Sequence, residues 1–113
     1  MQINEELLEG SIHKINLVGR MDVEGVGHID VKFAGMTASP RMAIVCDLTQ
    51  VPFMSSLGIR ALVMNAKSVG RRGGKMVILA PPPDVAEVLK TSGIPQIIPI
   101  YPTLAEAVSA VSM

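Results

Sequence analysis

The alternation of short apolar runs with segments of helical periodicity is the feature that most restricts the fold. Met42–Cys46 is almost wholly apolar, which is typical of a strand covered on both faces at the centre of a sheet. After the next loop, apolar residues recur with the spacing of an amphipathic helix, namely Ile59, Leu62, Val63, Ala66 and Val69. Strands separated by helices imply parallel crossovers, so this order predicts an α/β sheet with packed helices.

Glycine and proline positions delimit the remaining elements. We expect Arg60, Asn65 and Lys67 on the outer side of the main helix, with Gly70 as its stop. Pro99 lacks an N–H, which favours an edge position for the last strand. The expected order is β-β-α-β-α-β-α-β-α, a mostly parallel central sheet of about five strands with about four helices. The expected strands are 3–8, 12–18, 42–46, 75–79 and 97–100, a loop covers 47–52, and the helices are 23–36, 56–70, 83–92 and 104–111.

Length and composition exclude several classes of protein. The 113 residues suit one domain, residues 1–113, and 49% hydrophobic content excludes disorder. The net charge of +0 and the 3% aromatic content give no footprint for nucleic acid. No apolar run is long enough to cross a bilayer, and no signal-peptide pattern opens the chain. We therefore expect a cytoplasmic domain without direct membrane insertion; the oligomeric state is left open.

Motifs for metal, cofactor or nucleophilic chemistry are weak. The two histidines, His13 and His28, have no further ligand at metal-binding spacing, and Cys46 lies in an apolar run. Gly25-Val-Gly27 lacks the third glycine of a dinucleotide fingerprint. The segment Met54–Gly58 is not a nucleophile elbow, because no glycine precedes its serines. We expect no metal, no cofactor and no enzymatic activity.

The segment between the central strand and the main helix is the best candidate site. Ser55 and Ser56 lie where the first N–H groups of a helix lack intrahelical acceptors, so a hydroxyl there can cap the helix. The same position attracts anions. Asp22 and Asp47 end two expected strands nearby; Asp22 suits a docking rim or a turn cap equally, and Asp47 suits a structural role.

Several segments together resemble the STAS domain family, which includes bacterial anti-sigma factor antagonists and transporter tails. The signature loop is matched by Asp47-Leu-Thr-Gln-Val-Pro-Phe-Met-Ser-Ser-Leu-Gly-Ile59. Further matches, in the family's order, are Gly19–Asp22, Gly73–Met76, Thr91–Ile94 and Tyr101–Ala107. The chain departs from the family pattern at Ser55, where Asp is frequent, and at Leu57, where Ser, Thr or Ala is common.

The resemblance implies a phosphorylation switch. The serine that precedes x-Gly is the family's phosphate acceptor, which is Ser56 here, and Ser55 is a second candidate. The implied partners are an anti-sigma factor that is itself a serine kinase and a PP2C-type phosphatase; ATP and Mg²⁺ would belong to the kinase. The alternative is a small cytoplasmic STAS subunit of a membrane transporter or of a signalling scaffold.

The expected partner-binding surface surrounds Ser56. Met54 and Leu57 are predicted to form its apolar centre. Arg60 lies one helical turn from Ser56, close enough to interact with an added phosphate. The full expected set is Asp22, Met54, Ser55, Ser56, Leu57 and Arg60.

Overall fold

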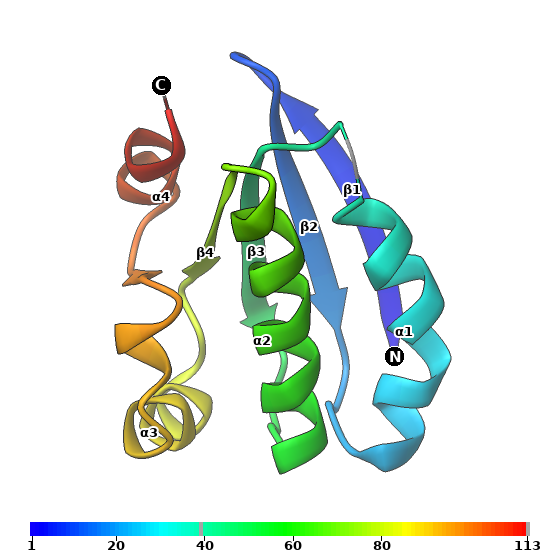
Figure 1. The fold of residues 1–113 in the computed structure, drawn as a ribbon. Coiled ribbons are helices and arrows are strands. Elements are labelled where there is room, and N and C mark those ends of the chain that lie inside the picture. The colour runs from blue at the N-terminus through cyan, green and yellow to red at the C-terminus, as the bar shows by residue number, and fades with distance from the viewer. Residues whose placement is uncertain (39, 113) are drawn as a thin grey trace.

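Five strands form one sheet whose spatial order follows the chain (Figure 1). The computed structural model describes residues 1–38 and 40–112. The first two strands pair antiparallel, with Ile3 opposite Leu17, and every later pair is parallel. The strands are β1 (Gln2–Leu8), β2 (Ile12–Val18), β3 (Ala43–Gln50), β4 (Lys75–Leu79) and β5 (Ile100–Tyr101). The predicted mostly parallel α/β sheet is confirmed.

The helices bury both faces of the central strand. Two hydrophobic cores lie on opposite faces of the sheet. Ile44 and Cys46 point into the larger core, which also holds Phe33 and Leu62, whereas Val45 points into the smaller core on the other face. This alternation explains why β3 is apolar throughout its first half. Helices α1, α2 and α3 supply the larger core and α4 covers the second face (Figure 1). Their bounds are α1 (Val23–Met36), α2 (Ser56–Arg71), α3 (Pro83–Thr91), the 3₁₀ turn η1 (Ile94–Gln96) and α4 (Leu104–Val111).

Two strand boundaries differ from the prediction. Asp47–Gln50 belongs to β3 rather than to a loop, because β2 continues to pair beside it as far as Val18. The last strand is Ile100–Tyr101 rather than 97–100. The N–H groups of Ile97 and Ile98 both donate to the Ile94 carbonyl at 2.8 Å, so this stretch is curled and cannot pair with β4.

Helix α2 also differs from the prediction at two positions, one on its outer side and one at its end. Asn65 is only 6% exposed, since its Oδ1 accepts from Thr37 Oγ1 and its Nδ2 donates to the Ala61 carbonyl, both at 2.7 Å. This buried pair joins α2 to the end of α1. Gly70 lies inside the helix, and the left-handed turn that follows uses Gly73 at φ +85°.

Candidate functional site

The candidate site lies where the loops after β2 and β3 meet. Met21 and Met54 form an isolated parallel bridge between the loops. The Met21 N–H donates to the Phe53 carbonyl at 2.9 Å, and the Ser55 N–H donates to the Met21 carbonyl at 3.0 Å. These bonds hold the start of α1 beside the start of α2, at the carboxyl edge of the parallel strands where ligands of α/β sheets gather.

The two adjacent serines have different environments. Ser55 is the N-cap of α2, because its Oγ accepts from the Gly58 N–H at 3.2 Å and donates to the Met21 carbonyl. Ser56 begins the helix and is exposed. The structure, which covers all residues but 39 and 113, gives the Ser56 hydroxyl no hydrogen-bond partner. The N–H groups of Ser56 and Leu57 have no intrahelical acceptor, so the free hydroxyl sits at the positive end of the helix dipole.

Replacing Ser55 with alanine tests the cap. The variant removes the acceptor for the Gly58 N–H and one link to Met21. Loss of an N-cap costs about 1 kcal/mol of folding free energy, and we expect that decrease in urea-induced unfolding followed by circular dichroism. Ser56→Ala, which removes an exposed hydroxyl without a cap bond, is the control and should unfold within about 0.5 kcal/mol of wild type.

Gly58 allows the start of α2 to pack directly on the two loops. A Cβ at this position would lie 2.5 Å from Met54 Sδ and 2.9 Å from Met21 Cβ. The Cβ of any other residue would collide with these two methionines and push the first turn of α2 away from the sheet. Gly58 therefore allows Ser56, in the same turn, to lie where it does. The glycine two residues after Ser56 therefore has a packing role.

Met54 does not lie at the surface, contrary to the prediction. Its side chain is only 4% exposed and belongs to the larger core. Side chains alternate along an extended segment, so the bridge to Met21 turns Met54 inward and leaves Phe53 outside. Phe53 is 38% exposed and Leu57 is 39% exposed, and these two supply the apolar surface next to Ser56.

Phe53 and Arg20 are site residues that the sequence reasoning missed. The Arg20 guanidinium lies over the Phe53 ring, 4.3 Å from its centroid, and Arg20 Nε is 3.5 Å from Asp22 Oδ2. A cation stacked on an aromatic face is an attractive contact. No pattern in the sequence distinguishes Phe53 from Met54, because the bridge between Met54 and Met21 determines which of the two is exposed. Both residues extend the site from α2 onto the loop before α1.

Asp22 caps α1. Its Oδ1 accepts from the Gly25 N–H at 2.7 Å, and this bond, together with Arg20, holds the pKa of the Asp22 carboxyl below its ordinary value. The side chain remains 40% exposed at the rim of the site. Asp22 therefore has a structural role as the N-cap of α1, and the outer face of its carboxylate remains open to a partner.

Asp47 has the structural role that was expected. Its Oδ2 is 3.1 Å from Lys14 Nζ on β2, and its Oδ1 accepts from the Thr49 N–H at 2.8 Å. Burial opposes ionisation of this carboxyl, but the hydrogen bonds from Thr49 and Lys14 outweigh it and lower its pKa. Asp47 forms its contacts within the sheet and does not join the Ser56 site.

Arg60 is exposed, one turn along α2 from Ser56.

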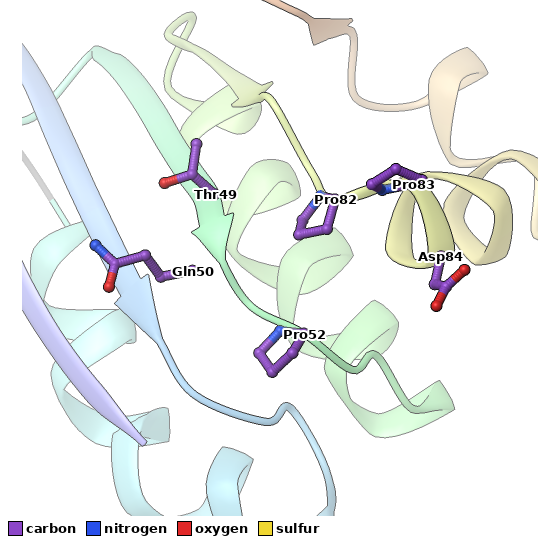
Figure 2. Close-up of a pocket in the computed structure, with 6 residues that line it drawn as sticks. All are labelled: Thr49, Gln50, Pro52, Pro82, Pro83 and Asp84. Atoms are coloured by element: carbon purple, nitrogen blue, oxygen red, sulfur yellow. The ribbon is translucent and has the colours of Figure 1, made fainter.

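A hollow of about 580 Å³ lies beside the β3–α2 loop (Figure 2). It runs from the end of β3 to the start of α3 and is lined by Thr49, Gln50, Pro52, Pro82, Pro83 and Asp84. These residues contribute one carboxylate and no cation. Pro83 also removes an N–H from the first turn of α3, so the hollow is poorly suited to a phosphate.

Three further observations concern metal binding, the Cys46 thiol and membrane-spanning helices. Among residues 1–38 and 40–112, no three His, Cys, Asp or Glu side chains come together as a metal site. Burial raises the pKa of the Cys46 thiol well above its ordinary range, so it remains protonated. In the same part of the chain, no helix combines the length and apolarity that crossing a bilayer requires.

A family model described as STAS domain matches residues 2–107. The chain belongs to the STAS domain family. This STAS domain is 26% identical over 94 residues to a Bordetella bronchiseptica protein named as an anti-sigma factor antagonist, BtrV, a match that covers 83% of this chain and 81% of that protein.

Solved structures share the fold. An anti-sigma factor antagonist (STAS) domain protein of Planctomyces limnophilus has a TM-score of 0.84 at 27% identity, with 97% of each chain covered. SpoIIAA of Bacillus, solved unphosphorylated and phosphorylated, has TM-scores of 0.78 and 0.71 at 22% identity; each match covers 97% of this chain, with 96% and 99% of the SpoIIAA chains covered. The STAS domain of a Vibrio cholerae SulP transporter has a TM-score of 0.69 at 25% identity, covering 88% of this chain and 77% of that one.

Proposed function

We propose that this STAS domain is a non-catalytic anti-sigma factor antagonist of the cytoplasm that is switched by phosphorylation of Ser56. In the unphosphorylated form it binds and sequesters an anti-sigma factor that is a serine kinase, and a PP2C-type phosphatase restores that form. The names of BtrV and of the Planctomyces relative support the antagonist class. Residues 1–113 act in this proposal as one domain.

The observation that carries the proposal is the exposed Ser56 hydroxyl at the first position of α2. A phosphate there adds about −1.5 to −2 charge and three acceptor oxygens. The open N–H groups of Ser56 and Leu57 and the helix dipole favour an anion at this position. The added group therefore needs no refolding, and the domain keeps its structure in both states.

The surroundings of Ser56 explain how a phosphate would break a complex. Phe53 and Leu57 offer apolar contact, and Asp22 and Arg60 offer polar contact at the rim. A partner that packs against the uncharged Ser56 hydroxyl would have to desolvate a dianion after phosphorylation, which costs several kcal/mol unless the dianion is paired. The proposed switch thus acts on binding and leaves folding intact.

Ser56 is favoured over Ser55 as the acceptor. The Ser55 hydroxyl is half-buried and already makes two hydrogen bonds, to the Gly58 N–H and the Met21 carbonyl. A kinase would have to break both bonds to reach it. The same argument makes Ser55→Ala a useful control, since it keeps Ser56 exposed.

Mass analysis of captured protein tests the proposal. Tagged protein is isolated from its own cells with its bound partners, and the bound and free fractions are weighed intact and mapped by proteolysis. We expect one phosphoryl group on Ser56, confined to the free fraction, and a kinase in the bound fraction. Ser55→Ala should still be modified and Ser56→Ala should not. Modification that persists in Ser56→Ala, or recovery with permease subunits alone, would contradict the proposal.

A further inference from the structure

The outward side of α2 carries a row of basic residues, Arg60, Lys67 and Arg71, which we call the α2 basic row. The residues are seven and four positions apart, so at 100° per residue they fall within about 40° around the helix axis. All three are exposed. Within residues 1–38 and 40–112, none of them has an ion-pair partner. The row runs along α2 from the turn after Ser56 to the last residue of the helix.

The charge of α2 is one-sided. Its 16 residues include three basic and no acidic side chains, whereas the whole chain has 10 basic and 10 acidic residues and a net charge of +0. A helix that only faced solvent would gain from mixed charges at i and i+4. Like charges that repel one another on one face instead create a local positive potential, which favours an acidic partner.

Apolar side chains stand beside the row. Met64, four residues after Arg60, is 58% exposed, and Val31 on the neighbouring helix α1 is 88% exposed. Between the two helices lies a groove of about 440 Å³, whose lining includes Val31, Met64 and Arg71. The lining also holds one carboxylate, Asp30 of α1, so the positive charge lies on the α2 side of the groove. Its floor contains the buried Thr37–Asn65 hydrogen bond, which ties the two helices together. The groove is therefore a formed feature of the α1–α2 pair.

We propose that the α1–α2 groove and the α2 basic row bind an acidic amphipathic helix of the anti-sigma factor. Apolar residues of that helix would enter the groove beside Val31 and Met64, and its carboxylates would pair with Arg60, Lys67 and Arg71. The assignment of this helix to the anti-sigma factor rests on the proposed function. Leu57 lies on the same side of α2 as Met64, seven residues earlier, so the surface is continuous with the site around Ser56.

An anionic membrane is the other surface that basic and apolar residues attract. The concave shape of the site favours a protein helix, because apolar side chains of a helix at i, i+4 and i+7 fill a groove, whereas a bilayer presents a broad surface.

Binding of defined probes to the intact protein tests the proposal. The first probe is a helical peptide of the length of α2, 16 residues, with leucines at i, i+4 and i+7 and glutamates on the flanks. The second is its twin with lysine for every glutamate, and the third is vesicles of phosphatidylglycerol and phosphatidylcholine. Amide chemical shifts report the position of binding. We expect saturable shifts along α2 and at Val31 with the acidic peptide only.

A pair of charge-reversal variants provides the matched control. Lys67→Glu/Arg71→Glu should weaken the acidic peptide by about tenfold or more, and binding should fall with added salt. Lys75→Glu/Lys90→Glu changes the net charge equally at exposed positions outside α2 and should alter affinity less than about twofold. Both variants should retain the wild-type circular dichroism spectrum.

Several outcomes would overturn the proposal. One is that the acidic peptide causes no saturable change in amide chemical shifts, or changes centred on the hollow beside β3. Others are that the lysine peptide binds equally well, or that both double variants lose the same affinity for the acidic peptide. Retention of the protein on the vesicles would also contradict the proposal. The probes need neither a kinase nor a modified Ser56, so this test is independent of the phosphorylation test. Loss of the Ser56 switch with the groove still binding the acidic peptide would reject the proposed function alone.

Discussion

Replacing Gly25 with alanine is expected to lower the free energy of unfolding by about 2 kcal/mol or more. A Cβ at this position would lie 2.0 Å from the Arg20 carbonyl oxygen and 3.1 Å from Asp22 Oδ1. The carbonyl is backbone and cannot yield unless the loop before α1 moves. Because that loop bridges to Met54 and holds the Ser55 N–H, the same change should displace the Ser56 site and weaken partner binding.

Gly27→Ala is the matched control for this prediction. Gly27 lies two residues further along α1 and is exposed, and a Cβ added there would have no heavy atom within 4 Å beyond its own helix backbone and chain neighbours. Alanine is favoured over glycine in a helix by up to about 1 kcal/mol, so this variant should be slightly more stable than wild type. Urea-induced unfolding measures both. Equal midpoints for the two variants would show that the contact with Arg20 does not restrict residue 25.

Phosphorylation of Ser56 is expected to weaken binding of the anti-sigma factor by about 100-fold or more, which corresponds to about 2.7 kcal/mol. The physical reason is the desolvation of a dianion against the apolar surface of Phe53 and Leu57. Titration calorimetry with the captured partner gives the dissociation constants. Ser56→Glu, with a single charge, should show a smaller loss in the same direction, and Ser56→Ala should bind within about twofold of wild type.

The thermal midpoint separates a binding effect from unfolding. The N-cap of α2 is Ser55 rather than Ser56, and a negative charge in the first turn of a helix is stabilising. Phosphorylated protein and Ser56→Glu should therefore melt at or slightly above the wild-type temperature. A drop in midpoint that parallels the loss of affinity would indicate that the phosphate disrupts the fold.

Local patterns in the sequence predict much of the fold. The apolar run at Met42–Cys46 and the periodic helix after it led to the correct parallel β3–α2 unit. Thr103, the residue before the expected helix 104–111, is the N-cap of α4, since its hydroxyl accepts from the Glu106 N–H at 3.2 Å. Capping and periodicity depend on residues within one or two turns, which is why they can be read along the chain.

Predictions failed where a distant residue decides the outcome. Asn65 has a polar amide side chain and was expected on the outer side of α2. It is buried instead, because Thr37, 28 positions earlier, supplies a hydrogen-bond partner for the amide. The pairing partner on β2 keeps Asp47–Gln50 extended. Hydrophobicity alone cannot distinguish Phe53 from Met54, and the bridge between Met54 and Met21 determines which of them is buried.

The sequence by itself determined the order of strands and helices, the caps, the candidate serines and the resemblance to STAS domains, because each depends on residues close together in the chain. Only the tertiary structure decided that Ser55 is engaged while Ser56 is free, that Phe53 replaces Met54 at the surface, and that α1 and α2 enclose a groove beside a basic row. Those features arise from contacts between segments far apart in sequence. Their geometry depends on how the two loops and the two helices pack together.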